Sequence, residues 1–186
     1  TERPDKVASA LLEGRVAIIT DGTPYVLIVP ATFVAFLTAS EDYYERAFTG
    51  SLVRAIRALA FFLALTLPST YVAITNFHQE LLPTSLTLSI AAQREGVPFV
   101  AIVEALFLEF SFELLREAGI RLPKPIGSAI SIVGALILGE AAVSAGLVSS
   151  ALVIVVAATA IASFISPIYS MSISVHLLRF PMIILA

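Results

Sequence analysis

The chain has 186 residues, of which 58% are hydrophobic and only 13% are charged, and its mean hydropathy is +0.95. This composition is typical of an integral membrane protein and argues against a soluble domain. The net charge of -3 comes without any basic run of the kind that binds nucleic acid. The lack of cysteine excludes a disulfide framework, a thiolate metal site and a cysteine nucleophile.

The first 39 residues predict the C-terminal edge of a cytosolic α/β domain. A short helix over Lys6–Gly14 is followed by two apolar, β-branched runs around Asp21-Gly22, a strong hairpin signal. A lone hairpin is marginally stable in water, so we expect further strands before residue 1. The chain shows no export signal and stops inside an apolar run, so we expect it to be a fragment.

Residues 40–186 predict a transmembrane domain with about four membrane-spanning helices and the start of a fifth. Ser40 is the expected cap of a helix that continues into the first span. The expected spans are 52–76, 98–116, 126–144 and 150–167, with another beginning at 180. Thr84–Arg94 is too short to cross and should lie in the membrane interface. The fold class is therefore an all-α polytopic membrane protein with a small N-terminal β-hairpin remnant.

Pro68 falls inside the first expected span. Because proline has no amide hydrogen and its ring clashes with the preceding turn, we expect it to kink or split this helix. Either outcome frees a backbone carbonyl near the middle of the membrane.

The second span is the most informative stretch, because it carries the carboxylates Glu104, Glu109 and Glu113 in an apolar helix. Each central charge costs roughly 2.5–3.5 kcal/mol on an insertion scale, whereas each large apolar side chain returns about 0.3–0.6 kcal/mol. Such a helix is unstable alone in lipid. Its carboxylates should be protonated, paired, or turned toward protein or a water-filled path.

Helical geometry places Glu109, Glu113 and Arg116 on one face, with Glu104 about 140° away from Glu109. We interpret Glu113 and Arg116 mainly as a helix end at the lipid headgroups. Glu104 and Glu109 lie deeper, and with Glu113 they are candidates for an ion path or for assembly. Glu140, near the far end of the third span, is either a further such carboxylate or an interfacial residue.

A seam of small residues at four-residue spacing runs along the third span and should let another helix approach closely. Its members are Gly127, Ser131, Ala135 and Gly139. Ile168–Arg179 is expected to be a polar-interrupted connector between the last two spans. With a cytoplasmic N-terminus, Arg46, Arg54, Arg57, Arg116, Arg121, Lys124 and Arg179 all fall on the inner side and only Arg94 on the outer, which is the positive-inside pattern.

Motifs for nucleotide binding and zinc hydrolysis do not occur in the sequence, and nothing orients a serine–histidine pair. We therefore expect no enzymatic activity and no cofactor or metal. A secondary transporter remains an alternative, because transporters also use proline-broken helices and buried carboxylates.

Five stretches of the chain also carry a family resemblance, and together they run over nearly its whole length. They are Glu13–Phe33 (EGRVAIITDGTPYVLIVPATF), Glu41–Phe48 (EDYYERAF), Phe77–Phe99 (FHQELLPTSLTLSIAAQREGVPF), Phe112–Gly146 (FELLREAGIRLPKPIGSAISIVGALILGEAAVSAG) and His176–Phe180 (HLLRF). They resemble the GerA family of bacterial spore germination proteins, specifically the A subunit of nutrient germinant receptors. The stage V sporulation AF type is a sibling with most of these motifs, and Glu109 and Glu113 favour the receptor branch.

The resemblance implies a spore inner membrane protein with a cytosolic N-terminal domain. It also implies that A subunits associate with transporter-like B and lipidated C subunits and form a homo-oligomer. That oligomer would be a nutrient-gated channel releasing monovalent cations. The alternatives are a transporter-like subunit and a scaffold that seats signalling partners.

Overall fold

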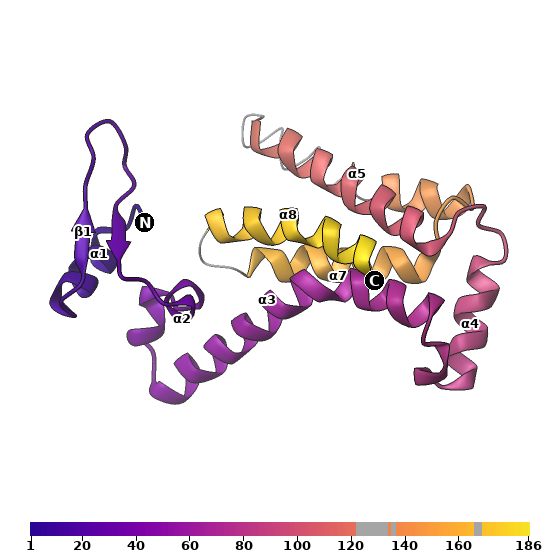
Figure 1. Cartoon of the computed structure of the whole chain (residues 1–186), viewed down its shortest axis with the longest axis horizontal. Coiled ribbons are helices and arrows are strands. Elements are labelled where there is room, and N and C mark those ends of the chain that lie inside the picture. Colours follow the sequence, from indigo (N-terminus) through magenta and orange to yellow (C-terminus); the bar gives the residue numbers. More distant parts are fainter. Residues whose placement is uncertain (122–133, 135–136, 166–168) are drawn as a thin grey trace. The chain divides into compact units, whose positions relative to one another are not determined.

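The computed structural model describes residues 1–121, 134, 137–165 and 169–186 (Figure 1). These residues form two compact units. The first unit is Thr1–Phe61 with Ser163–Ser174, and the second is Phe62–Ala162 with Val175–Ala186. The described part of the chain is mostly helical, with one small sheet of two strands, as the sequence predicts.

The first unit begins with helix α1 (Pro4–Leu12), which has proline in its first turn and is followed by Gly14 with φ +80°. Strands β1 (Val16–Ile18) and β2 (Leu27–Val29) pair antiparallel, which confirms the hairpin around Asp21-Gly22. The paired strands are shorter than the apolar runs. Just before β2, the amide and the carbonyl of Val26 both bond to Thr1, at 2.8 Å each.

The expected continuous helix from Ser40 is wrong at its start. The chain forms helix α2 (Phe33–Leu37), then a short 3-10 turn η1 (Ser40–Tyr43), and only then helix α3 (Ala47–Asn76). Asp42 explains the break, because its carboxylate accepts the amide hydrogen of Ala39 at 3.0 Å and closes the turn on itself.

Helix α3 continues through Pro68 to its end, so the expectation that proline splits the helix is wrong, whereas a kink there stays a prediction. Among the described residues, α3 is the one helix both long and apolar enough to cross a membrane. Ser150–Phe164 and Met171–Leu185 are shorter apolar helices. The number of membrane crossings therefore stays a prediction.

The second unit continues through turn η2 (Gln79–Leu81) to helix α4, whose bounds Thr84–Arg94 are those predicted from the sequence. Helix α5 runs over Ala101–Arg121, later at both ends than the expected span. Its first helical carbonyl is that of Val100, which accepts the amides of Val103 and Glu104, so the helix begins after Pro98.

A helical segment at 137–144 precedes helix α7 (Ser150–Phe164) and helix α8 (Tyr169–Leu185). The expected connector at Ile168–Arg179 is therefore wrong, because α8 is already helical from Tyr169. Its polar residues His176 and Arg179 are buried rather than exposed in a loop. In the sequence they predict an interruption of the apolar pattern, because their partners on α5 are distant along the chain.

A hydrophobic core joins the helices of the second unit, and Figure 1 shows α5, α7 and α8 running beside one another there. Its fully buried members come from the end of α3, from α5, from the 137–148 stretch, from α7 and from α8. They are Val72, Ala105, Leu108, Ala142, Val148, Leu152, Val156 and Ile183. This packing carries the charged side chains of α5 into the interior.

Candidate functional site: buried ion pairs between helices

The centre of the site is an ion pair between Glu109 on α5 and Arg179 on α8. The Nη1 of Arg179 donates to a carboxylate oxygen of Glu109 at 2.8 Å, and the side chains are 2% and 4% exposed. Removing one partner of such a pair leaves a buried charge uncompensated. The pair therefore ties α5 to α8.

Arg179 makes a second contact that ties in α3. Its Nε donates to the carbonyl oxygen of Ala64 at 2.8 Å. Ala64 lies four residues before Pro68, so its carbonyl is the one that the missing proline amide leaves without a helical donor. The carbonyl that proline frees is thus that of Ala64, and it accepts a hydrogen bond from the Arg179 guanidinium.

A second cluster lies one helical turn further along α5. The guanidinium of Arg116 bonds the carboxylate of Glu113, and the Nδ1 of His176 on α8 lies 3.6 Å from the same carboxylate. Glu113 is 31% exposed, whereas His176 and Arg116 are largely enclosed. The shared face of Glu109, Glu113 and Arg116 is therefore directed at α8.

Glu104 serves a different contact, at the beginning of α7. Its carboxylate accepts the amide hydrogen of Ser149 at 3.0 Å, and its side chain is 1% exposed. The first turn of α7 contains no acidic residue of its own. The first amides of a helix have no acceptor within the helix and carry positive partial charge. The Glu104 carboxylate from α5 supplies both an acceptor and a compensating negative charge.

Helix α4 completes this junction through two consecutive residues. Gln93 accepts hydrogen bonds from the Ser150 hydroxyl at 2.7 Å and from the Ala151 amide at 3.2 Å, so it also caps α7. Arg94 lies 3.4 Å from Glu104 and 3.4 Å from the side-chain oxygen of Asn76, at the end of α3. The last turn of α4 therefore connects α3, α5 and α7.

Several polar atoms of these clusters lack a hydrogen-bond partner among the described residues although they are buried. They are Glu104 Oε1, Glu109 Oε1, Arg116 Nε, His176 Nε2 and Arg179 Nη2. Buried polar atoms in proteins are normally bonded, so each such atom calls for an explanation. Four of the five belong to the Glu109–Arg179 pair and to the Glu113 cluster, whereas Glu104 Oε1 belongs to the junction of α4, α5 and α7.

The first unit holds a separate buried pair, between Asp42 of η1 and Arg57 of α3. The Arg57 Nη1 donates to Asp42 at 2.8 Å and to the Leu37 carbonyl at 2.7 Å, and Arg54 approaches the same carboxylate at 3.4 Å. Burial raises the pKa of Asp42, but hydrogen bonds from Arg57 and the Ala39 amide outweigh it, so the pKa lies below its usual value of 3.8. Arg57, which the sequence predicts only as an inner-side cation, is thus a buried partner of Asp42.

The remaining predicted residues are the small-residue seam and Glu140. Gly127, Ser131 and Ala135 of the small-residue seam lie outside the described residues. Gly139 lies in the helical segment at 137–144, where an added Cβ would meet a Val153 methyl group of α7 at 3.6 Å, an ordinary contact. Glu140 is exposed on the same segment.

Sequence reasoning found the carboxylates but missed their partners Arg179, His176 and Arg94. The sequence predicts Arg179 only as an inner-side cation; its side chain is buried, and its side of the membrane stays a prediction. One signal was available, since a proline-freed carbonyl and a buried carboxylate both require a donor. Arg179 supplies both from one side chain.

The fold and the site define a class of helical protein in which buried ion pairs connect apolar helices. Within that class, the chain belongs to the GerA family: the family described as Bacillus/Clostridium GerA spore germination protein matches residues 1–186. This confirms the resemblance found in the sequence. No solved structure matches the chain.

Individual relatives agree with the family. Spore germination protein KA of Bacillus subtilis (strain 168) is 61% identical over 184 residues, which cover 99% of this chain and 34% of the relative. Spore germination protein A1 of the same strain is 53% identical over 180 residues, covering 97% of this chain and 37% of the relative. Spore germination protein GerLA of Bacillus cereus is 49% identical over 186 residues, which cover 100% of this chain and 38% of the relative. The chain thus spans little more than a third of these relatives.

Proposed function

We propose that the chain is part of the membrane domain of a germinant-receptor A subunit, a non-enzymatic component of an oligomeric, nutrient-gated cation channel. The spore inner membrane is its proposed location, with a cytoplasmic N-terminus and with B and C receptor subunits as partners. Membership of the GerA family and the names of its relatives support the germination role.

The observation that carries the proposal is a row of charged and polar side chains between α5 and α8, whose Arg179 also bonds a backbone carbonyl of α3. Ionisable groups within apolar helices are expensive, and in membrane proteins they mark ion paths, relays or helix-pairing sites. Here the row contains a matched pair, Glu109 with Arg179, and polar atoms that lack partners among the described residues. We propose that the ion path runs beside this row.

Within this channel we assign Glu104 and Glu109 to helix pairing rather than to contact with the ion. Each is almost fully buried and has a defined partner, Ser149 for Glu104 and Arg179 for Glu109. Glu113 and Glu140 are more exposed and are the carboxylates that we assign to the cation path. A carboxylate beside an aqueous constriction concentrates cations there.

Ion flux through the full-length protein tests the proposal. The A subunit would be reconstituted with its B and C subunits into potassium-loaded liposomes, and nutrient would then be added. We expect a gated release of potassium that requires the A subunit. Steady uptake of nutrient coupled to an ion would instead support the transporter alternative.

A scaffold role is the second candidate, and the pairing itself favours it. Helices locked by Glu109–Arg179 and by Glu104 form a rigid seat on which other subunits can dock. Potassium release by B and C subunits alone, at the rate of the complete receptor, would support the scaffold and contradict the channel.

The proposed orientation has its own test, because the chain contains no cysteine. A single cysteine in place of Ser85, which is exposed on α4, should react with an impermeant maleimide only from the outer face. Reaction from the cytoplasmic face alone would overturn the topology.

A further inference from the structure

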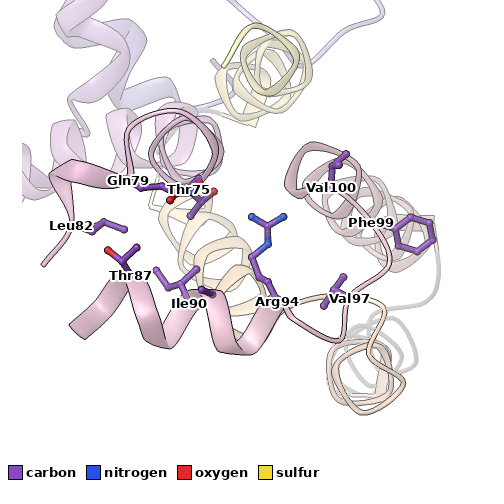
Figure 2. Close-up of a pocket in the computed structure, with 10 residues that line it drawn as sticks. Thr75, Gln79, Leu82, Thr87, Ile90, Arg94, Val97, Phe99 and Val100 are labelled. Atoms are coloured by element: carbon purple, nitrogen blue, oxygen red, sulfur yellow. Dashed lines mark hydrogen bonds between the residues drawn. The ribbon is translucent and has the colours of Figure 1, made fainter. Parts of the chain in front are cut away.

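A pocket lies between the end of α3, helix α4 and the start of α5 (Figure 2). Its volume is about 250 Å³. This is well above the roughly 30 Å³ that one water occupies in the liquid. It is slightly below the range of about 300–1,000 Å³ that is usual for small-molecule sites. The pocket is therefore suited to a small ligand.

The described lining is mainly apolar, and Arg94 is the charged side chain among the lining residues. Leu82, Ile90, Val97 and Val100 supply apolar contact surface. Figure 2 shows the guanidinium of Arg94 extending from the last turn of α4 into the space between Thr75 and Val100. One cation in an apolar pocket favours a ligand with one negative group and a short apolar body.

The other polar side chains of the lining are already engaged with the backbone. Gln79 donates to the Thr75 carbonyl at 2.7 Å, and Thr87 donates to the Pro83 carbonyl at 3.3 Å. Arg94 is held less tightly, since its contacts to Asn76 and to Glu104 are both 3.4 Å long. A guanidinium has five N–H donors, so Arg94 can bind a carboxylate through two of them.

We propose that this pocket binds a small carboxylate with a short apolar chain, whose carboxylate pairs with Arg94 and whose chain packs against Leu82, Ile90 and Val97. The bound carboxylate competes with Glu104 for Arg94. Glu104 keeps its hydrogen bond from the Ser149 amide but loses its nearest counter-charge, and the contacts of the ligand must outweigh that cost.

A consequence for gating follows, and it rests on the proposed channel. Arg94 connects the pocket to Glu104 on α5, and the neighbouring Gln93 holds the beginning of α7. A ligand that draws Arg94 away from Glu104 changes the junction of α4, α5 and α7. A carboxylate with higher affinity for the rearranged junction would shift the population toward it.

Binding is tested on the full-length protein in nanodiscs of zwitterionic lipid, without measuring flux, so that failure of the site and failure of the channel are separate results. The probe is butyrate, and butyramide is the neutral control of nearly the same shape. Ligand-observed NMR or calorimetry should detect butyrate at least tenfold more strongly than butyramide. Equal binding of both, or no binding of butyrate, overturns the proposal.

Variants separate a binding role of Arg94 from a structural one. Arg94→Gln should weaken butyrate binding at least tenfold, whereas Glu95→Gln, which removes a charge from the adjacent exposed residue, should leave it unchanged. Ala91→Leu should also weaken binding, because it fills the pocket without altering charge. Loss of binding in Glu95→Gln as well would show a non-specific effect and overturn the assignment.

Glu104→Gln should change the affinity for butyrate in the opposite direction. It keeps an oxygen for the Ser149 amide but removes the charge that competes for Arg94, so butyrate should bind severalfold more tightly. Weaker or unchanged binding contradicts the competition. If butyrate does not bind but phosphatidylglycerol stabilises the wild type and not Arg94→Gln, the pocket takes a lipid headgroup and the proposal is overturned.

Discussion

The Nε of Arg179 donates to the carbonyl oxygen of Ala64, the carbonyl that Pro68 deprives of its helical donor four residues later. The same guanidinium neutralises Glu109. One side chain on α8 thus satisfies a backbone defect in α3 and a buried charge in α5. The three helices are coupled through this residue more specifically than apolar packing alone would couple them.

The coupling between Pro68 and Arg179 predicts non-additive substitutions. Arg179→Gln should destabilise the protein by about 3–5 kcal/mol, because it leaves Glu109 buried without a counter-charge. Pro68→Ala returns an amide to the Ala64 carbonyl, so the Arg179 contact to that carbonyl becomes dispensable. The destabilisation of the double variant should therefore be about 1–3 kcal/mol smaller than the sum of the effects of the two single substitutions.

Unfolding of the full-length protein in detergent, monitored as loss of helical signal, measures this cycle. Strict additivity of the two single substitutions would show that Arg179 does not compensate for the proline.

The Asp42–Arg57 pair predicts an acid-sensitive start of α3. The pKa of Asp42 is below its ordinary 3.8 in the folded protein, so the pair contributes its full stability above about that value. That stability is lost as the pH falls through the lower, folded pKa. Hydrogen-exchange protection factors over residues 37–60, which correct for the pH dependence of intrinsic amide exchange, should fall below pH 4 in the wild type. Asp42→Asn should be less protected at pH 6 and should change little with acid.

Asp21→Asn, in the exposed hairpin loop, is the matched control and should follow the wild type. Identical acid dependence in the wild type and Asp42→Asn would contradict the assignment.

Gly50, near the start of α3, leaves no room for a side chain beside the turn η1. A Cβ added there would lie 2.6 Å from the backbone oxygen of Asp42, and a backbone atom cannot yield as a flexible side chain can. Gly50→Ala should therefore cost about 1–3 kcal/mol, although alanine is the better helix former by about 1 kcal/mol. Gly96, where an added Cβ has nothing within 4 Å, provides the neutral control. Thermal unfolding in detergent would compare the two variants, and equal midpoints would contradict the close approach.

Gly139 predicts a graded response at the contact with α7. Its added Cβ would lie 3.6 Å from Val153, so Gly139→Ala should be tolerated and Gly139→Leu should reduce assembly. Leu138 is partly buried against the core, so the exposed Ile137 is the better control. Ile137→Ala should assemble normally. Assembled protein can be quantified by gel filtration in detergent, and normal amounts of Gly139→Leu would show that this face does not pack.

Local signals predicted much of the fold correctly. The bounds of α4, the glycine after α1 and the hairpin follow from patterns a few residues long, where neighbouring residues decide the conformation. The missed start of α8 has the opposite origin. His176 and Arg179 look like a polar interruption until Glu109 and Glu113 are known to face them, and that pairing joins residues about 60–70 positions apart.

In the candidate site too, local patterns predicted some features, whereas contacts between residues distant in sequence could not be predicted. Helical periodicity placed Glu109 and Glu113 on one face, and insertion energetics indicated that Glu104 and Glu109 need partners. Neither argument identifies which side chain supplies them. Glu104 illustrates the limit, because its principal partner is a backbone amide at the start of α7, which no residue pattern reveals.

The central claim is that Glu109 and Arg179 hold the helices of the gated region together as a pair. Germinant-triggered cation release from spores, normalised to assembled receptor, tests it most directly with Glu109→Arg, Arg179→Glu, the exchanged pair and Glu109→Gln. Each charge reversal alone should abolish assembly, and the exchanged pair should restore it in part. Glu109→Gln should lower the amount of assembled receptor but leave release per receptor unchanged. Normal assembly of Glu109→Gln with reduced release per receptor would contradict the account and place Glu109 in the ion path.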